Sequence, residues 1–467
     1  MNIRRRFGAA AVFLTVVLMV SSTATSSLAI SSLETFSLAT SSFMTLPFVT
    51  VALAAERTEL PRRYDGRGAG RTASVRDQGD LGTCWAFASL LALENRLLPA
   101  ENWSFSTDHM SNNPDFAIGQ EGGGEYTIAL AYLLSWQGPV REEDDPYGDG
   151  VSPEGLTAVK HVQEVRILPE YDRDAIKRAV LDYGGVQGSL YVTLRVSLGT
   201  SDDGGTETIL KVGSGDTGYY RADTTAYYYP QESVPNHDVV IVGWDDDFPK
   251  ENFAVQPETD GAFLCENSWG SQFGENGFFY VSYCDANLGQ TAIAYTGVED
   301  ADNYDCIYQS DRCGWIGQLG YGTETAWAAN AYTASSAQIL EAAGFYATGT
   351  NTAYQIYVSA SLPGMDETKT AKLRLAAEGQ LEDAGYYTIP FQTKFRLNEK
   401  ERFFVIIRLT TPDAVHPIAV EYDAGDGKCR VDLDDGEGYI SPDGETWTRA
   451  ETEQGCNVCL KAYSRGR

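Results

Sequence analysis

Apolar positions in the first half of the chain recur with the period of a helix in three stretches. Residues 84–98 are almost wholly apolar and stop at Pro99, which predicts a buried helix. Residues 125–136 place their apolar side chains on one helical face. Residues 172–183 begin with Asp172 as a capping residue and are followed by two glycines that end a helix. We therefore expect three helices here, one of them inside the core.

Strands are predicted where apolar residues run together or alternate. Residues 238–244 form an apolar run directly after His237 and are typical of a buried strand, and residues 188–196 alternate. In the second half the apolar runs are short, as at 354–358 and 403–408, and turns recur between them. Such a pattern is typical of a β-sandwich, so the whole chain is predicted to be of the α+β class.

Length and charge limit the organisation and the partners. A chain of 467 residues is too long for one core, so two domains and a leader are expected. The formal charge of −30 disfavours nucleic acid and anionic membrane surfaces as partners. Residues 199–235 are polar and then rich in tyrosine, and we interpret them as an insertion whose tyrosines either face the substrate or pack.

The N-terminus has the order of a secretory signal. Three arginines at 4–6 are followed by an apolar run at 7–20 and then by small residues. We assign residues 1–54 to this leader, with cleavage after Ala29 or after Ala54. An uncleaved anchor is the alternative, so a membrane is expected as a partner only through this segment. The mature protein is therefore expected to be secreted or held at the cell surface.

The eight cysteines are too sparse for a disulfide scaffold, and none of their spacings is typical of a zinc site. Candidate bridges are Cys306 with Cys313, and Cys429 with Cys456 or Cys459. The acidic group between residues 432 and 437 is interpreted as a solvated turn, with calcium as the alternative. The sequence thus predicts no metal site and no cofactor.

Cys84 is the candidate nucleophile because it follows a glycine-containing turn and opens the predicted buried helix. A thiol at a helix N-terminus is expected to have a lowered pKa. Gln78, six residues earlier, can donate an N–H to an oxyanion beside it. A nucleophilic thiol also needs a base. Of the four histidines, His237 opens a predicted buried strand, which would hold its ring rigidly.

Three segments together resemble the active-site segments of the papain-like (family C1) cysteine peptidases: QGDLGTCWAF at 78–87, NHDVVIVGW at 236–244 and ENSWG at 266–270. The resemblance implies a nucleophilic Cys84, His237 as acid and base, and Asn267 as the residue that orients the imidazole. It also implies that Gln78 contributes to the oxyanion hole and that Trp269 shields the His237–Asn267 hydrogen bond. The implied fold has two lobes, one helical and one β-barrel-like.

Three glycines at 122–124 precede the predicted helix at 125–136. In the family, a Gly-Gly before such a helix forms one wall of the substrate cleft, so Gly123 and Gly124 are expected to bind the peptide backbone. Most members join this wall to the catalytic turn by a disulfide, but Leu81 and Glu121 stand where the two cysteines would be. We therefore expect that bridge to be missing as a whole, and the family's long helical propeptide to be absent.

Residues 305–330, with GQLGYG at 317–322 and AWAAN at 326–330, resemble the lectin-like domain that follows secreted bacterial and archaeal papain-like peptidases. The expected organisation is a leader at 1–54, a peptidase domain at 58–297 and a lectin-like β-sandwich at 298–467. Cell-surface glycans are the partners that such a domain implies, although the fold alone does not prove sugar binding.

Together these features predict a secreted cysteine endopeptidase. It would hydrolyse peptide bonds of protein and peptide substrates through a thioester on Cys84, with His237 as acid and base. One alternative is a surface adhesin or carbohydrate-binding protein with a vestigial peptidase. The other is a transpeptidase or amidase that uses the same thioester.

Overall fold

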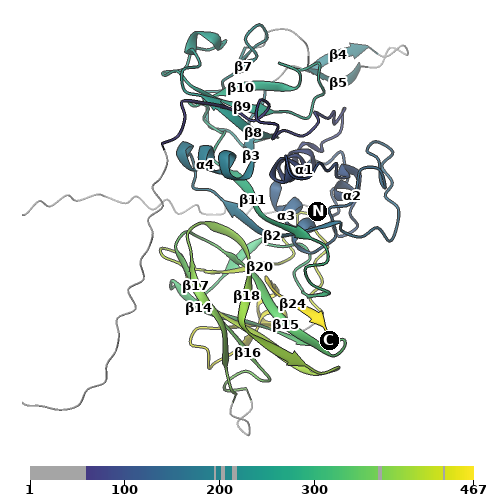
Figure 1. The fold of residues 1–467 in the computed structure, drawn as a ribbon, viewed down its shortest axis with the longest axis vertical. Helices are drawn as coiled ribbons and strands as arrows, with labels where there is room; N and C mark the ends of the chain where they lie inside the picture. The colour runs from purple at the N-terminus through teal and green to yellow at the C-terminus, as the bar shows by residue number, and fades with distance from the viewer. Residues whose placement is uncertain (1–58, 194–195, 201–205, 213–217, 366–370, 435–436) are drawn as a thin grey trace, which may run out of the picture. The chain divides into compact units, whose positions relative to one another are not determined.

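The helix predicted at residues 84–98 is present as α1 (Cys84–Leu97), and all its residues except Cys84 and Arg96 are buried (Figure 1). It packs against β8 (His237–Asp245), β11 (Ala292–Asp300) and α3 (Tyr126–Leu134). The helix ends at Leu97 because the next residue is extended before a proline. The mostly apolar sequence of α1 thus reflects the elements that surround it.

The computed structural model describes residues 59–193, 196–200, 206–212, 218–365, 371–434 and 437–467. The leader predicted at residues 1–54 lies outside these ranges. Residues 59–467 form one unit by their internal contacts. In the described part of the chain, no helix combines the length and the apolar character needed to span a bilayer.

The remaining helices are short, and α4 (Arg173–Tyr183) confirms the cap predicted at Asp172. Asp172 accepts a hydrogen bond from the N–H of Ala175, and Gly184, with φ 95°, ends the helix. These helices are α2 (Thr107–Ser111), α4 (Arg173–Tyr183), η1 (Lys250–Asn252) and α5 (Ala450–Gln454).

The largest sheet has thirteen strands among the described residues and draws on both halves of the chain. From one edge to the other its order is β12 (Cys306–Tyr308), β24 (Leu460–Gly466), β15 (Gln338–Ala347), β18 (Ala384–Leu397), β2 (Lys160–Ile167), β11, β3 (Val186–Leu190), β8, β9 (Ala262–Glu266), β10 (Phe278–Ser282), β7 (Ala226–Tyr227) and β6 (Tyr220–Arg221), with β1 (Arg63–Asp65) paired to β8. The catalytic histidine predicted from sequence therefore begins a strand inside this sheet.

The two halves of the chain meet where β2 pairs with β18. The pairing is antiparallel and runs from Ala384 opposite Ile167 to Tyr387 opposite Glu164. Side chains of the second half, including Tyr346 and Tyr386, belong to the same buried cluster as those of α1 and α3. The core of the first half is thus completed by residues of the second.

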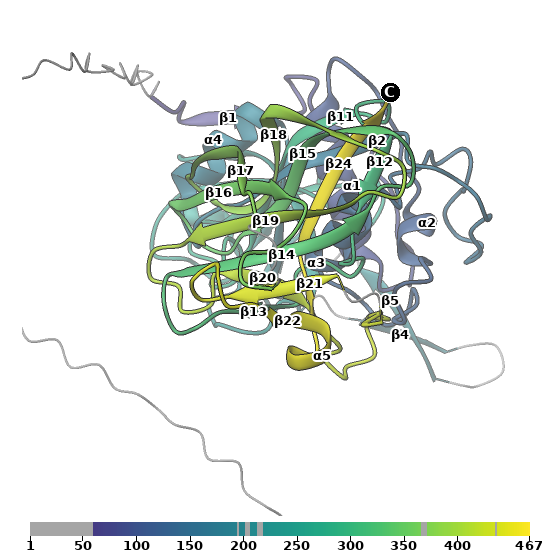
Figure 2. The same cartoon turned by 90° about the horizontal axis from the view of Figure 1, so that it is seen from below.

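The second half is the predicted β-sandwich. A second sheet has the order β17 (Arg374–Leu381), β16 (Thr352–Ser359), β19 (Arg402–Thr410), β14 (Thr325–Thr333), β21 (Gly438–Ser441) and β22 (Thr448–Arg449). Figure 2 shows β16, β19 and β14 lying across β15, β18 and β24, and one buried cluster joins side chains of both layers. Two small sheets complete the described strands: β13 (Gly317–Leu319), β20 (Ile418–Glu421) and β23 (Asn457–Val458), and the hairpin of β4 (Val196–Thr200) and β5 (Thr206–Val212).

The strand predicted at residues 188–196 is shorter and earlier than expected, since β3 ends at Leu190. Beyond it, the side chain of Asn236 accepts from the N–H of Val192 and donates to its carbonyl, in place of a sheet ladder. Within the predicted insertion, Tyr220 and Tyr227 are buried in the short strands β6 and β7. These two tyrosines therefore pack into the core.

Candidate active site

Cys84 is the first residue of α1, and its half-buried thiol accepts a hydrogen bond from the backbone N–H of Asp238. That N–H belongs to the second residue of β8, so the contact places the thiol beside His237. The preceding residue, Thr83, is fixed by a hydrogen bond of 2.7 Å between its Oγ1 and the hydroxyl of Tyr147. The turn that carries Cys84 and the strand that begins at His237 therefore meet, as the sequence predicted for two parts of one site.

The imidazole of His237 is oriented by two neighbours from the segment after β9. Its Nε2 lies 2.7 Å from Oδ1 of Asn267, and its ring stacks on Trp269 with 4.4 Å between ring centres. Because an amide oxygen can only accept, Nε2 carries the proton and Nδ1 of the neutral ring is left as the base. His237 is 5% exposed and Asn267 is fully buried, so this hydrogen bond is shielded from water.

The predicted lowering of the thiol pKa is wrong for the thiol taken alone. Burial raises the pKa of Cys84 to about 12, and the carboxylate of Asp238 adds to the increase. Burial also lowers the pKa of His237 to about 4, opposed by its hydrogen bond to Asn267. Neither charge is stable by itself in this site. These shifts favour a thiolate on Cys84 only where His237 carries the proton, because the two opposite charges then offset each other.

The side chain of Gln78 lies in the same turn and is held at both ends. Its Nε2 donates to the carbonyl of Leu81 at 2.7 Å, and its Oε1 accepts from Oγ of Ser268 at 2.6 Å. Because a backbone carbonyl can only accept, Leu81 fixes which end of the amide carries the N–H groups, and the Ser268 hydroxyl holds the other end in place. Ser268 was not predicted from sequence as a positioning residue, although it stands next to Asn267 in the segment ENSWG at 266–270.

Replacing Ser268 by alanine is expected to lower kcat with little change in KM, because the Gln78 amide loses the bond that orients it. One such hydrogen bond is worth about 0.5–1.5 kcal/mol, which corresponds to roughly a 2- to 10-fold loss. The steady-state kinetics of peptide hydrolysis measure both kcat and KM. Ser135→Ala is the matched control, because this buried hydroxyl follows α3 and donates to the carbonyl of Ala131 in that helix. An unchanged kcat in Ser268→Ala would show that Ser268 is not needed to orient the Gln78 amide.

The glycines predicted to bind substrate lie against the catalytic turn. A Cβ on Gly124 would lie 2.5 Å from the indole of Trp85, and Gly123 has φ +70°. A Cβ on Gly82 would lie 2.9 Å from the backbone nitrogen of Gly123. Glycine is therefore required for this wall to approach the turn. The N–H of Gly82 donates to the carbonyl of Gln120 at 2.9 Å, which joins the two segments without the family's disulfide.

Asp238 is a buried acid next to the thiol that was missed as a site residue. Its carboxylate accepts a hydrogen bond of 2.9 Å from Nε2 of Gln187, and burial raises its pKa to about 6. The oxygen of the same Gln187 amide accepts from Ser89 of α1 and from Tyr295 of β11. The signal available in the sequence was an aspartate at the start of an apolar strand.

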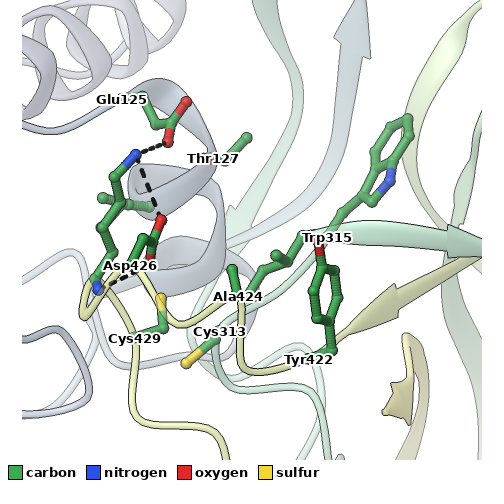
Figure 3. Close-up of a pocket in the computed structure, with 11 residues that line it drawn as sticks. Glu125, Thr127, Cys313, Trp315, Tyr422, Ala424, Asp426 and Cys429 are labelled. Atoms are coloured by element: carbon green, nitrogen blue, oxygen red, sulfur yellow. Dashed lines mark hydrogen bonds and ion pairs between the residues drawn. The ribbon is translucent and has the colours of Figure 1, made fainter. Parts of the chain in front are cut away.

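A pocket lies where the start of α3 faces the second half of the chain (Figure 3). Glu125 on one side forms an ion pair of 2.8 Å with Lys428 on the other. All eight cysteines lie in the described ranges and are free thiols. The candidate bridges are therefore absent, and Cys313 and Cys429 both line this pocket as free thiols.

Comparisons with known proteins agree with this arrangement. The family described as papain family cysteine protease matches residues 60–298, and the family described as lectin like domain matches residues 307–464. Cathepsin S of Bos taurus is 27% identical over 48% of this chain and 60% of its own length. Cathepsin K of Gallus gallus is 28% identical over 50% of this chain and 61% of its own length. The matched region thus spans about three fifths of these relatives.

Two solved structures share the fold. The clostridial cysteine protease Cwp84 after propeptide cleavage superposes with a TM-score of 0.74 at 24% identity, over 87% of this chain and 99% of that one. The cysteine protease and lectin-like domains of Cwp84 of Clostridium difficile give 0.73 at 23% identity, over 88% and 90%. The papain-like fold followed by a lectin-like β-sandwich, expected from the sequence, is confirmed. Because the papain-family match covers just over half of the chain, the protein belongs to the papain family of cysteine proteases.

Proposed function

We propose that the protein is a secreted cysteine endopeptidase in which Cys84 is the nucleophile. As its proton passes to Nδ1 of His237, the sulfur attacks the carbonyl carbon of a peptide bond. The oxyanion accepts hydrogen bonds from the N–H groups of the Gln78 side chain and the Cys84 backbone. His237 then gives its proton to the leaving amine, and water activated by His237 hydrolyses the thioester.

The observation that carries this proposal is the His237–Asn267 hydrogen bond, buried beneath Trp269 and next to the Cys84 thiol. Such an arrangement fixes the tautomer of a base, which a vestigial site has no need to retain. We assign the binding of the substrate backbone to Gly123 and Gly124, because they line the approach to the catalytic turn.

Secretion is supported by two observations. The N-terminus has the basic, apolar and small-residue order of a signal. Cwp84, which shares the fold, is described as a surface layer associated protein. Export to the cell exterior would bring the lectin-like half within reach of cell-surface glycans.

The test is active-site titration of the reduced, processed protein with an epoxide inhibitor of papain-like enzymes. We expect stoichiometric labelling of Cys84, located by peptide mass, and hydrolysis of a protein substrate that stops when labelling is complete. The labelled residue must be unreactive in His237→Ala. Absence of labelling in folded, reduced protein would favour the vestigial-peptidase alternative. Products that contain an added amine instead of water would favour a transpeptidase.

A further inference from the structure

Three carboxylates converge at a distance from the catalytic pair. Oxygen atoms of Asp108, Asp145 and Asp149 all lie within 4.8 Å of one another. Asp108 belongs to α2, and the other two belong to the loop that follows Arg141. Asp108 and Asp145 are 0% and 2% exposed, whereas Asp149 is exposed. Among the ion pairs of the described residues, none involves these three aspartates.

Asp145 is the member of this cluster whose hydrogen bonding is incomplete. Its Oδ2 is buried and has no hydrogen-bond partner. Asp108 differs, since its carboxylate accepts from Nε2 of Gln120 at 2.6 Å and from the N–H of Gly150 at 3.1 Å. A buried carboxylate oxygen without a partner costs free energy unless a hydrogen-bond donor or a cation meets it. Asp145 therefore has a free oxygen that can accept a cation, and its carboxylate converges with two others.

We propose that Asp108, Asp145 and Asp149 bind a divalent cation, and that this cation is calcium. The converging ligands are oxygen atoms only, which favours a hard cation over zinc or copper. Calcium accepts six to eight oxygens in irregular arrangements, whereas magnesium requires near-ideal octahedral geometry and keeps several waters. The exposed side at Asp149 leaves room for waters to complete the coordination.

The cation would act on the active site through Tyr147, which lies in the loop between Asp145 and Asp149. The Tyr147 hydroxyl donates to the carbonyl of Gln78 at 2.9 Å and lies 2.7 Å from Oγ1 of Thr83. Its ring packs edge-on against Phe87 of α1, with 4.8 Å between ring centres. A cation that fixes this loop therefore fixes the turn that carries the nucleophile. This effect of the cation on the active site rests on the proposed peptidase function.

Binding is tested by calorimetric titration of calcium into the chelator-treated protein, with the melting temperature measured in parallel. We expect one saturable site and a higher melting temperature with calcium, and a Kd at least ~10-fold weaker in Asp145→Asn and in Asp149→Asn. Without calcium, Asp145→Asn is expected to melt above the wild-type protein, because one of three repelling charges is gone. Asp144→Asn, an exposed carboxylate of the same loop, is the matched control and should bind as the wild-type protein does.

Several results would overturn the site. These are no calcium binding by the wild-type protein, unchanged affinity in both cluster variants, or binding of zinc but not of calcium. Loss of calcium binding in Asp432→Asn, in the acidic turn noted in the sequence, would move the site there. Because Asp149 is exposed, its variant is expected to fold even where Asp145→Asn does not.

The link to the active site is tested with Tyr147→Phe, which keeps the ring and the three carboxylates. This variant should bind calcium with the wild-type Kd, but calcium should no longer raise its rate of peptide hydrolysis. An equal rate increase in both proteins would overturn the link. Failure of the proposed function itself would look different, since no sample would hydrolyse peptide while calcium binding stayed intact.

Discussion

Cys84 is expected to lose its reactivity with iodoacetamide near neutral pH when His237 is replaced by alanine. A buried thiol with a pKa of about 12 is ionised at pH 7 in only about one molecule in 10⁵. In the wild-type protein the imidazole accepts the proton, so a thiolate–imidazolium pair is available. Peptide hydrolysis should fall by roughly 10⁴-fold or more, because nucleophile and base act as one unit. The second-order alkylation rate, read at Cys84 by mass, measures the effect.

The pH dependence separates this account from a thiol that ionises alone. With pKa values of about 4 for His237 and about 12 for Cys84, the pair shares one proton between these limits. The wild-type rate should therefore rise as the pH passes about 4 and then stay level apart from a small step near pH 6, where the neighbouring Asp238 ionises. Below about pH 4, both nitrogen atoms of the His237 ring carry a proton, so the ring can no longer accept the thiol proton. The rate of His237→Ala should instead rise only toward strongly alkaline pH.

The matched control is His416→Ala, which removes an exposed histidine and should leave the profile unchanged. A wild-type rate of alkylation in His237→Ala at pH 7 would show that the helix N-terminus activates the thiol without a base. A wild-type alkylation rate that rises steadily with pH, with no level region, would also show that the thiol ionises without the help of His237.

Lys461→Met is expected to destabilise the fold by about 3–5 kcal/mol, which is the usual cost of leaving one partner of a buried ion pair alone. The ammonium of Lys461 in β24 lies 2.7 Å from Oδ1 of Asp311, and the two side chains are 1% and 0% exposed. Burial raises the pKa of Asp311, and Lys461 opposes that increase. Without the lysine, the remaining carboxylate must be neutralised or stay charged in the core.

The loss should depend on pH in a defined direction. In Lys461→Met the folded-state pKa of Asp311 lies above its unfolded value, so the stability deficit is smallest in acid and grows as pH rises through the folded pKa. Urea unfolding at pH 5 and pH 8 measures the deficit. Adding Asp311→Asn should recover most of it, because both charges are then gone. Lys394→Met is the control: the Lys394 side chain is 63% exposed in its ion pair with Glu341, so about 0–1 kcal/mol is expected. Equal losses in the two lysine variants would contradict the argument.

Features that depend on local sequence were predictable. The apolar run of α1, the Asp172 cap and the strand after His237 each follow from neighbouring residues. Gln78, Cys84, His237 and Asn267 were named from three separate segments, and the structure brings these segments together. What they do chemically remains a prediction until the labelling experiment is done.

Features that depend on long-range packing were not predictable. The thiol pKa was expected to fall because the helix dipole is visible in the sequence, whereas the burial and the Asp238 carboxylate that raise it come from β8. Nothing in the sequence of the loop at 141–150 shows that Asp108 of α2 faces it. The pairing of β2 with β18 joins residues more than 200 positions apart, and neither strand carries a mark of its partner.

That pairing has a consequence for any attempt to make the catalytic half on its own. A recombinant fragment that stops near residue 298 would remove β18 and leave β2 as an unprotected edge from Glu164 to Ile167. It would also uncover the apolar surface that Tyr346 and Tyr386 fill. An open edge beside bare apolar surface recruits strands from other molecules. Such a truncation is therefore expected to aggregate during expression, which would make the second half of the chain a folding partner of the first.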